Sequence, residues 1–283
     1  MEMRNFSGKT AIVTGAASGI GFGIASAFAR DGMNLVLVDI QPDALAAAHQ
    51  AIDALGARVI ALPADVSNAA SVEAVAREAE AAFGKIHVVV NNAGVAFHGA
   101  PLTKIELRDW EWVIGVNIYG VIHGIRTFVP LIQKHGEGGH VVNTASTAGF
   151  RVVPGLLHGA YAMTKHAVVA LTEALQQELS GANIGVTMLC PGAVNTDLDA
   201  SSKHRPERFG GGFQRSEHQF MREFMAQGLS PLWVGERLLR GMKDGEFMLF
   251  TSTAPRNGIA ERHDMVSQAF DRAQAIEAEQ HKR

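Results

Sequence analysis

The chain has 283 residues, of which 47% are hydrophobic and 19% charged, and its formal net charge is −3. This composition is typical of one large α/β domain or two small ones with a substantial core, and it excludes a disordered chain. A net charge this close to zero provides no general attraction for nucleic acid, so we expect no nucleic-acid partner. The only cysteine, Cys190, excludes an intrachain disulfide and fits a reducing cytoplasm.

Neither the N-terminal residues nor the apolar segments of the chain predict contact with a membrane. Residues Met1–Lys9 contain no long apolar core and no cleavage signature of a signal peptide. Apolar runs elsewhere stay shorter than the ~18 residues that a span requires. We therefore expect a cytoplasmic protein without a membrane span.

The first functional signal is a glycine-rich turn between a predicted strand and a predicted helix. The apolar run Thr10–Val13 ends at Thr14–Gly21, and Ile24 and Phe28 follow at helical spacing. Glycines let the backbone approach a pyrophosphate, which the N-terminus of the following helix then faces. The alternative interpretation is an ordinary tight turn, although the flanking strand and helix favour a dinucleotide site.

A carboxylate follows the second predicted strand. The apolar run Asn34–Val38 ends at Asp39. At this position a carboxylate can accept hydrogen bonds from the ribose hydroxyls of an adenine nucleotide, and it repels a 2′-phosphate. Asp39 therefore favours NAD over NADP.

The rest of the chain alternates between short apolar runs and amphipathic stretches. Further strands are predicted at Arg58–Leu62, Ile86–Val90, His140–Thr144, Gly185–Leu189 and Phe247–Phe250, and helices at Pro42–Leu55, Ala69–Phe83, Leu107–His135, Tyr161–Ser180 and Gly228–Met242. This alternation predicts an α/β fold, a doubly wound parallel sheet of about seven strands over roughly residues 7–251 with helices on both faces. Ligands bind beyond the carboxyl ends of such strands, where the glycine-rich turn, Asp39, Asp65–Val66 and Asn91–Gly94 all lie.

Tyr161 and Lys165 provide the candidate chemistry. Their spacing of four places both side chains on one face of the predicted helix, one turn apart. A nearby ammonium group favours the phenolate, so this pair can exchange a proton with an alcohol or a carbonyl. Taken alone, the pattern is more typical of a solvated helix face. Asn117 is also unusual, because asparagine is a poor residue for the interior of a helix. The alternative interpretation is an asparagine whose side chain faces solvent.

In their order and spacing these segments resemble the short-chain dehydrogenase/reductase family, in its shorter branch of single-domain oxidoreductases. The matching pieces are Thr14–Gly21, Asp65, Asn91–Gly94, Asn117, Ser146, Tyr161 with Lys165, and Pro191–Thr196, and they cover roughly residues 8–197. The loop between Ser146 and Tyr161 is slightly longer than is usual in the family. The resemblance implies one domain over residues 1–283, with a substrate lid at 198–230 and a C-terminal extension at 252–283.

The resemblance implies a role for each catalytic residue. Tyr161 would be the general acid/base, and Ser146 would hold the substrate oxygen. Lys165 would lower the pKa of the tyrosine and bind the nicotinamide ribose, and Asn117 would hold a water in a proton relay. Because Lys165 and the positive ring of NAD⁺ both favour the phenolate, we expect them to outweigh burial and to bring the pKa of Tyr161 below its free value.

The resemblance also implies a set of cofactor-binding residues, among which Asp65 and Val66 would contact the adenine and Val194 and Thr196 the carboxamide. The full set is Gly15, Ser18, Gly19, Ile20, Gly21, Asp39, Asp65, Val66, Asn92, Ala93, Gly94, Tyr161, Lys165, Val194 and Thr196. Asn91 would be mainly structural. The chemistry needs no metal, and the sequence has no cluster with metal-ligand spacing.

The implied activity is NAD-dependent hydride transfer between the nicotinamide and a secondary alcohol or ketone. Val141–Ser146, Pro191–Thr196 and Asp244–Phe250 resemble the bacterial Cα-dehydrogenases, which oxidise benzylic alcohols of lignin-derived aryl ethers, and so point to a bulky aromatic substrate. The alternatives are a 3-oxoacyl or steroid-type ketone reductase, a catalytically silent NAD-binding sensor or scaffold, and an epimerase or dehydratase of the family's longer branch. The presence of Asn117, Ser146, Tyr161 and Lys165 together disfavours the sensor or scaffold. The short length of the chain disfavours the epimerase or dehydratase.

The lid and the long helices lead to further expectations. The charged residues of the lid fit recognition of an acidic substrate or a solvated loop. They are Lys203, His204, Arg205, Arg208, Arg215, His218 and Arg222, against Glu207, Glu217 and Glu223. The apolar residues of the lid, Phe209, Phe213, Phe220, Met221, Phe224 and Met225, fit an aromatic substrate or packing within the lid. Further pocket candidates are Phe97, His98, Phe150, His158 and Met188.

The helices Leu107–His135 and Tyr161–Ser180 carry apolar residues on more than one face, and the resemblance implies a homodimer or homotetramer built on them. Asn257–Arg283 would be a helix or tail that packs on a neighbouring subunit or frays.

Overall fold

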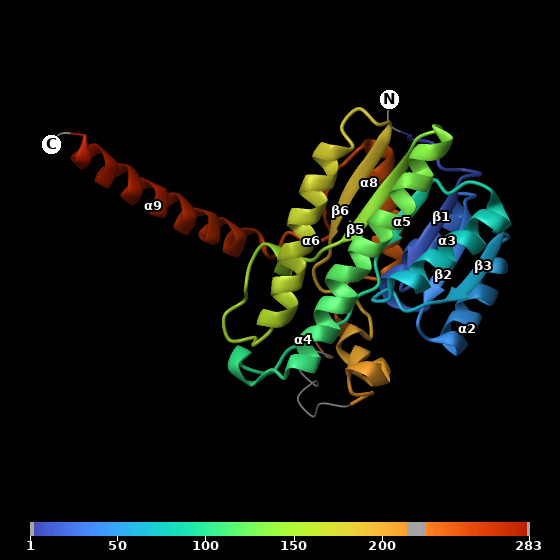
Figure 1. The fold of residues 1–283 in the computed structure, drawn as a ribbon, viewed down its shortest axis with the longest axis horizontal. Coiled ribbons are helices and arrows are strands. Elements are labelled where there is room, and N and C mark those ends of the chain that lie inside the picture. The colour runs from blue at the N-terminus through green and yellow to red at the C-terminus, as the bar shows by residue number, and fades with distance from the viewer. Residues whose placement is uncertain (1–2, 214–222, 224, 282–283) are drawn as a thin grey trace.

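The computed structural model describes residues 3–213, 223 and 225–281. Seven parallel strands form one sheet in the order β3-β2-β1-β4-β5-β6-β7 (Figure 1). The strands are β1 (Thr10–Thr14), β2 (Asn34–Asp39), β3 (Val59–Pro63), β4 (Val88–Asn91), β5 (Gly139–Thr144), β6 (Ile184–Cys190) and β7 (Met248–Phe250). The predicted doubly wound parallel sheet is confirmed, with strand ends that differ from the prediction by one or two residues.

Helices cover both faces of the sheet. The α-helices are α1 (Gly19–Arg30), α2 (Pro42–Asp53), α3 (Ala69–Phe83), α4 (Leu107–Ile114), α5 (Gly120–His135), α6 (Gly159–Glu178), α8 (Pro231–Asp244) and α9 (Arg256–Gln280). One layer contains α1, α2 and α8, and the other contains α3, α4, α5 and α6. Figure 1 shows α5 and α6 side by side across the front of the sheet.

The side chains of the strands alternate between these two layers because successive residues of a strand point to opposite faces. In β1, Ala11 and Val13 pack with α1, α2 and α8, whereas Ile12 packs with the opposite layer. Phe28 of α1 and Phe128 of α5 are fully buried, one in each layer. The sheet is therefore covered on both sides, as its nearly continuous apolar strands predict.

The predicted helix Leu107–His135 is interrupted. Its middle, Gly115–Tyr119, is π-helical, and it separates α4 from α5. By length and composition the whole stretch is apolar enough to cross a membrane. Trp112, Phe128 and Ile132 are nevertheless buried against the sheet, so we assign the stretch to the core.

Helix α9 projects away from the rest of the molecule (Figure 1). Gly258 is its only buried residue, and the side chains of Met265, Phe270 and Ile276 are exposed. In proteins most helical stability comes from packing of an apolar face, which α9 does not bury within this chain.

The strand order places a crevice at the carboxyl ends of β1 and β4. From β1 the chain winds outward through β2 and β3, and from β4 it winds the other way through β5 to β7. The loops after β1 and β4 therefore diverge, and ligands of doubly wound sheets bind in such crevices.

Candidate active site

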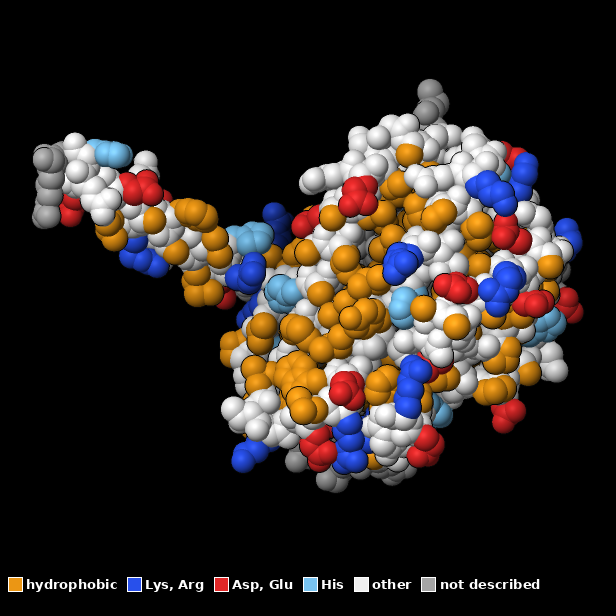
Figure 2. All heavy atoms as spheres, in the orientation of Figure 1, with side chains coloured by type: hydrophobic (Ala, Val, Ile, Leu, Met, Phe, Trp, Pro, Cys, Tyr) orange, Lys and Arg blue, Asp and Glu red, His pale blue; other side chains and the backbone are white. Residues whose placement is uncertain are grey.

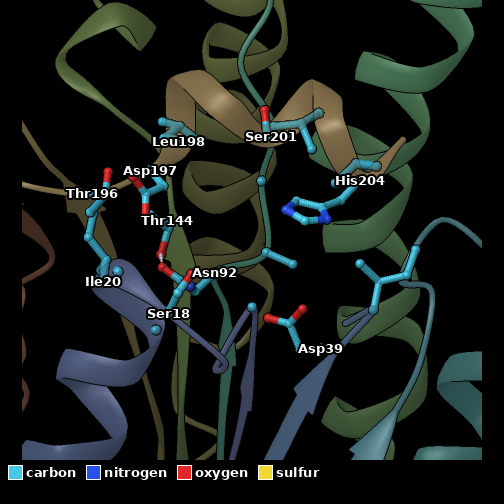
Figure 3. Close-up of a pocket in the computed structure, with 18 of the residues that line it drawn as sticks. Ser18, Ile20, Asp39, Asn92, Thr144, Thr196, Asp197, Leu198, Ser201 and His204 are labelled. Atoms are coloured by element: carbon cyan, nitrogen blue, oxygen red, sulfur yellow. Dashed lines mark hydrogen bonds between the residues drawn. The ribbon is translucent and has the colours of Figure 1, made fainter. Parts of the chain in front are cut away.

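A cavity of about 410 Å³ opens at this crevice (Figure 3). Its lining includes every residue predicted to bind the cofactor: Gly15, Ser18, Gly19, Ile20, Gly21, Asp39, Asp65, Val66, Asn92, Ala93, Gly94, Tyr161, Lys165, Val194 and Thr196. Ser146 lines it as well, whereas Asn117 lies behind the wall. The structure thus brings together residues from six strand ends. Their roles in binding remain predictions.

The glycine-rich turn forms the floor of the cavity. The hydroxyl of Thr14 accepts hydrogen bonds from the backbone N–H groups of Asn92 (2.9 Å) and Ala93 (3.0 Å), which ties the turn to the loop after β4. Gly15 has a φ of +66°, and a Cβ there would lie 2.9 Å from the Cα of Ala93, so only glycine fits. A Cβ at Gly21 would lie 2.0 Å from the carbonyl oxygen of Gly15.

The N-terminus of α1 is suited to an anion. Its N-cap, Ser18, makes no side-chain capping bond, and its first turn contains no acidic residue. The first backbone N–H groups of a helix have no partner within the helix and carry partial positive charge. A pyrophosphate would therefore fit between this turn and the cavity, as the glycine-rich motif predicts.

Asp39 lies at the end of β2 and is held by two backbone groups. One carboxylate oxygen accepts a hydrogen bond from the N–H of Ala17 (3.1 Å), and the other accepts one from Gln41 (3.1 Å). Each oxygen keeps a further lone pair. The buried carboxylate can therefore accept from ribose hydroxyls without rearrangement, and its charge opposes a 2′-phosphate.

Asp65 has a partner that the sequence does not reveal. One of its oxygens accepts hydrogen bonds from the backbone N–H (2.9 Å) and the hydroxyl (2.5 Å) of Ser67. The other accepts a hydrogen bond from the guanidinium of Arg208 at 2.7 Å, across 143 residues of sequence. The predicted adenine contact is therefore already fixed in orientation, and the lid reaches this end of the cavity.

Asn117 lies in the π-helical segment and is buried, not facing solvent. Its side-chain oxygen accepts from the N–H of Val95 (2.8 Å), and its amide donates to the Val95 carbonyl (3.0 Å) and to the hydroxyl of Thr164 (3.0 Å). Both amide hydrogens are used, so the side chain locks the loop after β4 onto α6. A relay water would have to bind the backbone of the π-helical turn, where the regular i to i−4 bonding is interrupted.

The catalytic candidates converge where β5 meets α6. Ser146 follows β5, and Tyr161 and Lys165 lie in the first turns of α6. The Nζ atom of Lys165 lies 5.7 Å from the centre of the Tyr161 ring and donates a hydrogen bond to the carbonyl of Thr144 at 2.8 Å. The predicted spacing of one helical turn thus places a buried ammonium beside a phenol.

Burial and the neighbouring side chains act on the pKa of Tyr161 in opposite directions, and the lowering expected in the complex with NAD⁺ stays a prediction. Burial raises the pKa of Tyr161 above its usual value, and a hydrogen bond with the Ser146 hydroxyl only partly opposes this shift. Burial also lowers the pKa of Lys165 to about 8. Burial therefore disfavours the charged form of both side chains. The sequence identified the neighbouring cation but not the extent of desolvation, which dominates here.

The roof of the cavity comes from the start of the predicted lid. Leu198, Ser201 and His204 lie on the 3-10 helix η4 (Leu198–His204), and Figure 3 shows them above Ser18 and Asp39. The sequence marked His204 only as one of several lid cations. The predicted lid residues Arg215, Glu217, His218, Phe220, Met221, Arg222 and Phe224 lie outside the described residues. Phe97, His98, Phe150, His158 and Met188 do not line this cavity, and Met188 belongs to the core.

A cluster with metal-ligand chemistry lies at the opposite end of the sheet. Ligand atoms of His87, His135 and Glu137 lie within 4.8 Å of one another. Both ring nitrogens of His135 are engaged, one with the carbonyl of Ile86 (2.8 Å) and one with the N–H of Glu137 (3.1 Å). Lysines 9 and 85 also pair with Glu137. We interpret the cluster as an ion-pair network.

Fold and cavity together define an α/β dinucleotide-binding oxidoreductase. The model of the short chain dehydrogenase family matches residues 9–207, and the chain belongs to this family. It is 33% identical to a CLA biosynthesis dehydrogenase/reductase of Lactiplantibacillus plantarum over 88% of this chain and 90% of that one. A C alpha-dehydrogenase of Sphingobium sp. is 32% identical over 92% and 86%. The structure of a family member from Burkholderia phymatum in complex with NAD superposes with a TM-score of 0.89 and 38% identity, covering 94% and 97% of the chains.

Proposed function

We propose that this protein is an NAD-dependent alcohol dehydrogenase or ketone reductase whose substrate is a secondary, aromatic alcohol or the corresponding ketone. The observation that carries the proposal is the convergence of Ser146, Tyr161 and Lys165 on a cavity that also contains the glycine-rich turn. A protein that only bound a nucleotide would need the turn but not a phenol and an ammonium next to each other.

The cofactor fits the residues that are present. The glycines leave space where any Cβ would collide, and the uncapped N-terminus of α1 supplies N–H groups for a pyrophosphate. When bound, the nicotinamide supplies the hydride chemistry. Asp39, held by Ala17 and Gln41, supports a preference for NAD over NADP because its charge opposes a 2′-phosphate.

Each catalytic side chain would then act on the substrate oxygen or on its proton. Ser146 would donate a hydrogen bond to that oxygen and stabilise its developing charge. In carbonyl reduction Tyr161 would donate its phenolic proton, and the raised pKa of Tyr161 keeps that proton in place through the neutral range. In alcohol oxidation Tyr161 must accept the proton, which requires positive charge from Lys165 and the oxidised ring. Asn117 would hold the relay water.

The proposed aromatic substrate is supported by the relative named a C alpha-dehydrogenase and by apolar residues of the cavity. The apolar residues that line it include Val95, Trp112, Leu198, Pro206 and Met225. Apolar and aromatic walls with a few polar groups are typical of pockets for small organic ligands.

The oligomeric state of the protein, its location in the cell and its division into domains are also proposals. Hydrophobic side chains gather on the face formed by α5 and α6 (Figure 2). The exposed hydrophobic side chains in or just before these helices are Tyr119, Leu157 and Met163. This surface supports a homodimer or homotetramer built on these helices. We propose a cytoplasmic enzyme whose residues 1–283 act as one domain.

The test is NADH absorbance with purified protein and a panel of secondary alcohols and ketones, with aryl members matched to alkyl members of similar size. We expect turnover with the aryl members and faster turnover with NAD⁺ than with NADP⁺. Clear NADH binding without turnover of any member would favour the sensor alternative. Turnover of only 3-oxoacyl or steroid ketones would exclude the benzylic substrate while keeping the enzyme class.

A further inference from the structure

The segment 198–213, which we call the roof, crosses the cavity from the substrate end to the adenosine end. Leu198, Ala200, Ser201, His204 and Pro206 all line the cavity. In Figure 3 the ring of His204 is directed into the cavity above Asp39. A lid that served the substrate alone would not need to reach the residues that bind the adenosine half.

One arginine fixes the roof to α4. Arg205 is buried and pairs with the buried carboxylate of Asp109. It also donates to the carbonyl of Gly211 at 2.8 Å, and its guanidinium lies 4.2 Å from the centre of the Phe213 ring. Opening this contact would leave two charges uncompensated in the interior, so we expect it to persist when ligands enter and leave.

A second arginine closes the roof on the adenosine side. Arg208 donates a hydrogen bond at 2.7 Å to Oδ2 of Asp65, the carboxylate oxygen that Ser67 does not use. It also contacts the hydroxyl of Ser67. The next residue, Phe209, packs over the chain near Gly115 and Ser67. The Arg208 and Asp65 side chains are 41% and 22% exposed, against 4% and 9% for Arg205 and Asp109, so this pair can open in water at low cost.

The cavity of about 410 Å³ persists beneath the roof while the Arg208–Asp65 contact is formed. The closed contact is therefore compatible with an occupied cavity. Because each oxygen of Asp65 has two lone pairs, the one that Arg208 uses can still accept a hydrogen bond from an adenine amino group.

We propose that Arg208 is a positioning residue for the cofactor, a latch that holds the roof over the adenosine half and must open for the cofactor to leave. This inference rests on the proposed function, namely that a nicotinamide dinucleotide occupies the cavity. The latch acts through Asp65 and Ser67, and Arg205 serves as the fixed hinge point on the other side of the roof.

The experiment measures NADH dissociation by stopped-flow fluorescence in the wild type and in Arg208→Gln. An exposed ion pair corresponds to roughly a two- to fivefold change in an opening equilibrium, so we expect the dissociation rate of NADH to rise by this factor. The Kd should change less, because the Arg208–Asp65 contact is formed with the cavity empty as well as occupied. The KM for the alcohol at saturating NAD⁺ should stay unchanged. Ser67→Ala should shift the rate in the same direction. The matched control is Arg240→Gln, which removes an 81% exposed arginine of α8 and should change nothing.

Two fragments locate the effect. In Arg208→Gln the dissociation rate of ADP-ribose, which contains the adenosine half, should rise by the same factor as that of NADH. The dissociation rate of nicotinamide mononucleotide should not change. An unchanged NADH dissociation rate, or an equal acceleration for both fragments, would overturn the latch. Failure of the proposed function gives a different result, because the wild type would then bind no NADH, or would bind it without turning over any member of the alcohol and ketone panel.

Discussion

Gly21→Ala tests whether the glycine-rich turn holds the cofactor, because the structure leaves no room for a single methyl group there. The added Cβ would lie 2.0 Å from the carbonyl oxygen of Gly15 and 2.7 Å from the side-chain nitrogen of Asn92. That nitrogen is itself held by the carbonyl of Thr14 at 2.9 Å. Contacts of a Cβ below 3.0 Å essentially never occur, so the turn must move. Such overpacking costs typically about 1–3 kcal/mol, which corresponds to roughly a 5- to 150-fold weaker Kd if the bound geometry is lost.

The assay is an NADH fluorescence titration with a thermal melt of the same sample. The control is Gly56→Ala, where φ is +84° and no atom lies within 4 Å of the added Cβ. That variant strains the backbone by roughly 1–2 kcal/mol, so its Tm should fall while its Kd stays unchanged. A Gly21→Ala protein that binds NADH like the wild type would refute the role of the turn.

Three further predictions test the site and the assembly. Tyr161→Phe keeps the ring but removes the exchangeable proton, so turnover should be abolished while NADH binding persists; near-normal turnover would contradict its role as acid/base. Asp39→Ala should narrow the ratio of NADH to NADPH affinity in parallel titrations, and tighter NADPH binding by the wild type would contradict the preference. Light scattering at micromolar concentration should give a dimer or tetramer, and a monomer would exclude assembly through α5 and α6.

The fold and the walls of the cavity were predictable because their signals are local in the sequence. Each strand is a short apolar run, and the predicted cofactor-binding residues follow strand ends or begin the next helix. Parallel topology then brings distant ends such as Gly15 and Asn92 to one edge without any knowledge of side-chain packing. Asn117 could be selected from the sequence because its signal is also local: asparagine is a poor residue for the interior of a helix.

Features that depend on distance in space could not be predicted. Arg208 was one of several charged residues in a lid, and only the fold places it on Asp65. The cluster of His87 and Glu137 forms because two loops meet at the far end of the sheet. The direction of the pKa shift of Tyr161 depends on how much water the first turns of α6 exclude, and no spacing rule reports that quantity.

Burial of the charged Lys165 side chain in the active site lowers the stability of the folded protein. The same burial lowers the pKa of this side chain from 10.5 to about 8. Between these two values the unfolded chain binds more protons than the folded one, so stability rises as pH rises from about 8 towards 10.5. Below about 8 both states are protonated, and the folded protein bears the whole penalty, about 3 kcal/mol.

Lys165→Met should therefore inactivate the enzyme and yet not destabilise it at neutral pH. Methionine has a similar length and carries no charge, but it leaves the Thr144 carbonyl without its donor, which costs about 1–3 kcal/mol and offsets part of the gain. The difference in unfolding free energy between the variant and the wild type, from urea denaturation, cancels all other titrating groups. That difference should move by about 3 kcal/mol in favour of the wild type between pH 7 and pH 10.5. A difference that does not change with pH would show that Lys165 is not a buried ammonium at neutral pH, and that Tyr161 lacks the neighbouring charge that alcohol oxidation requires.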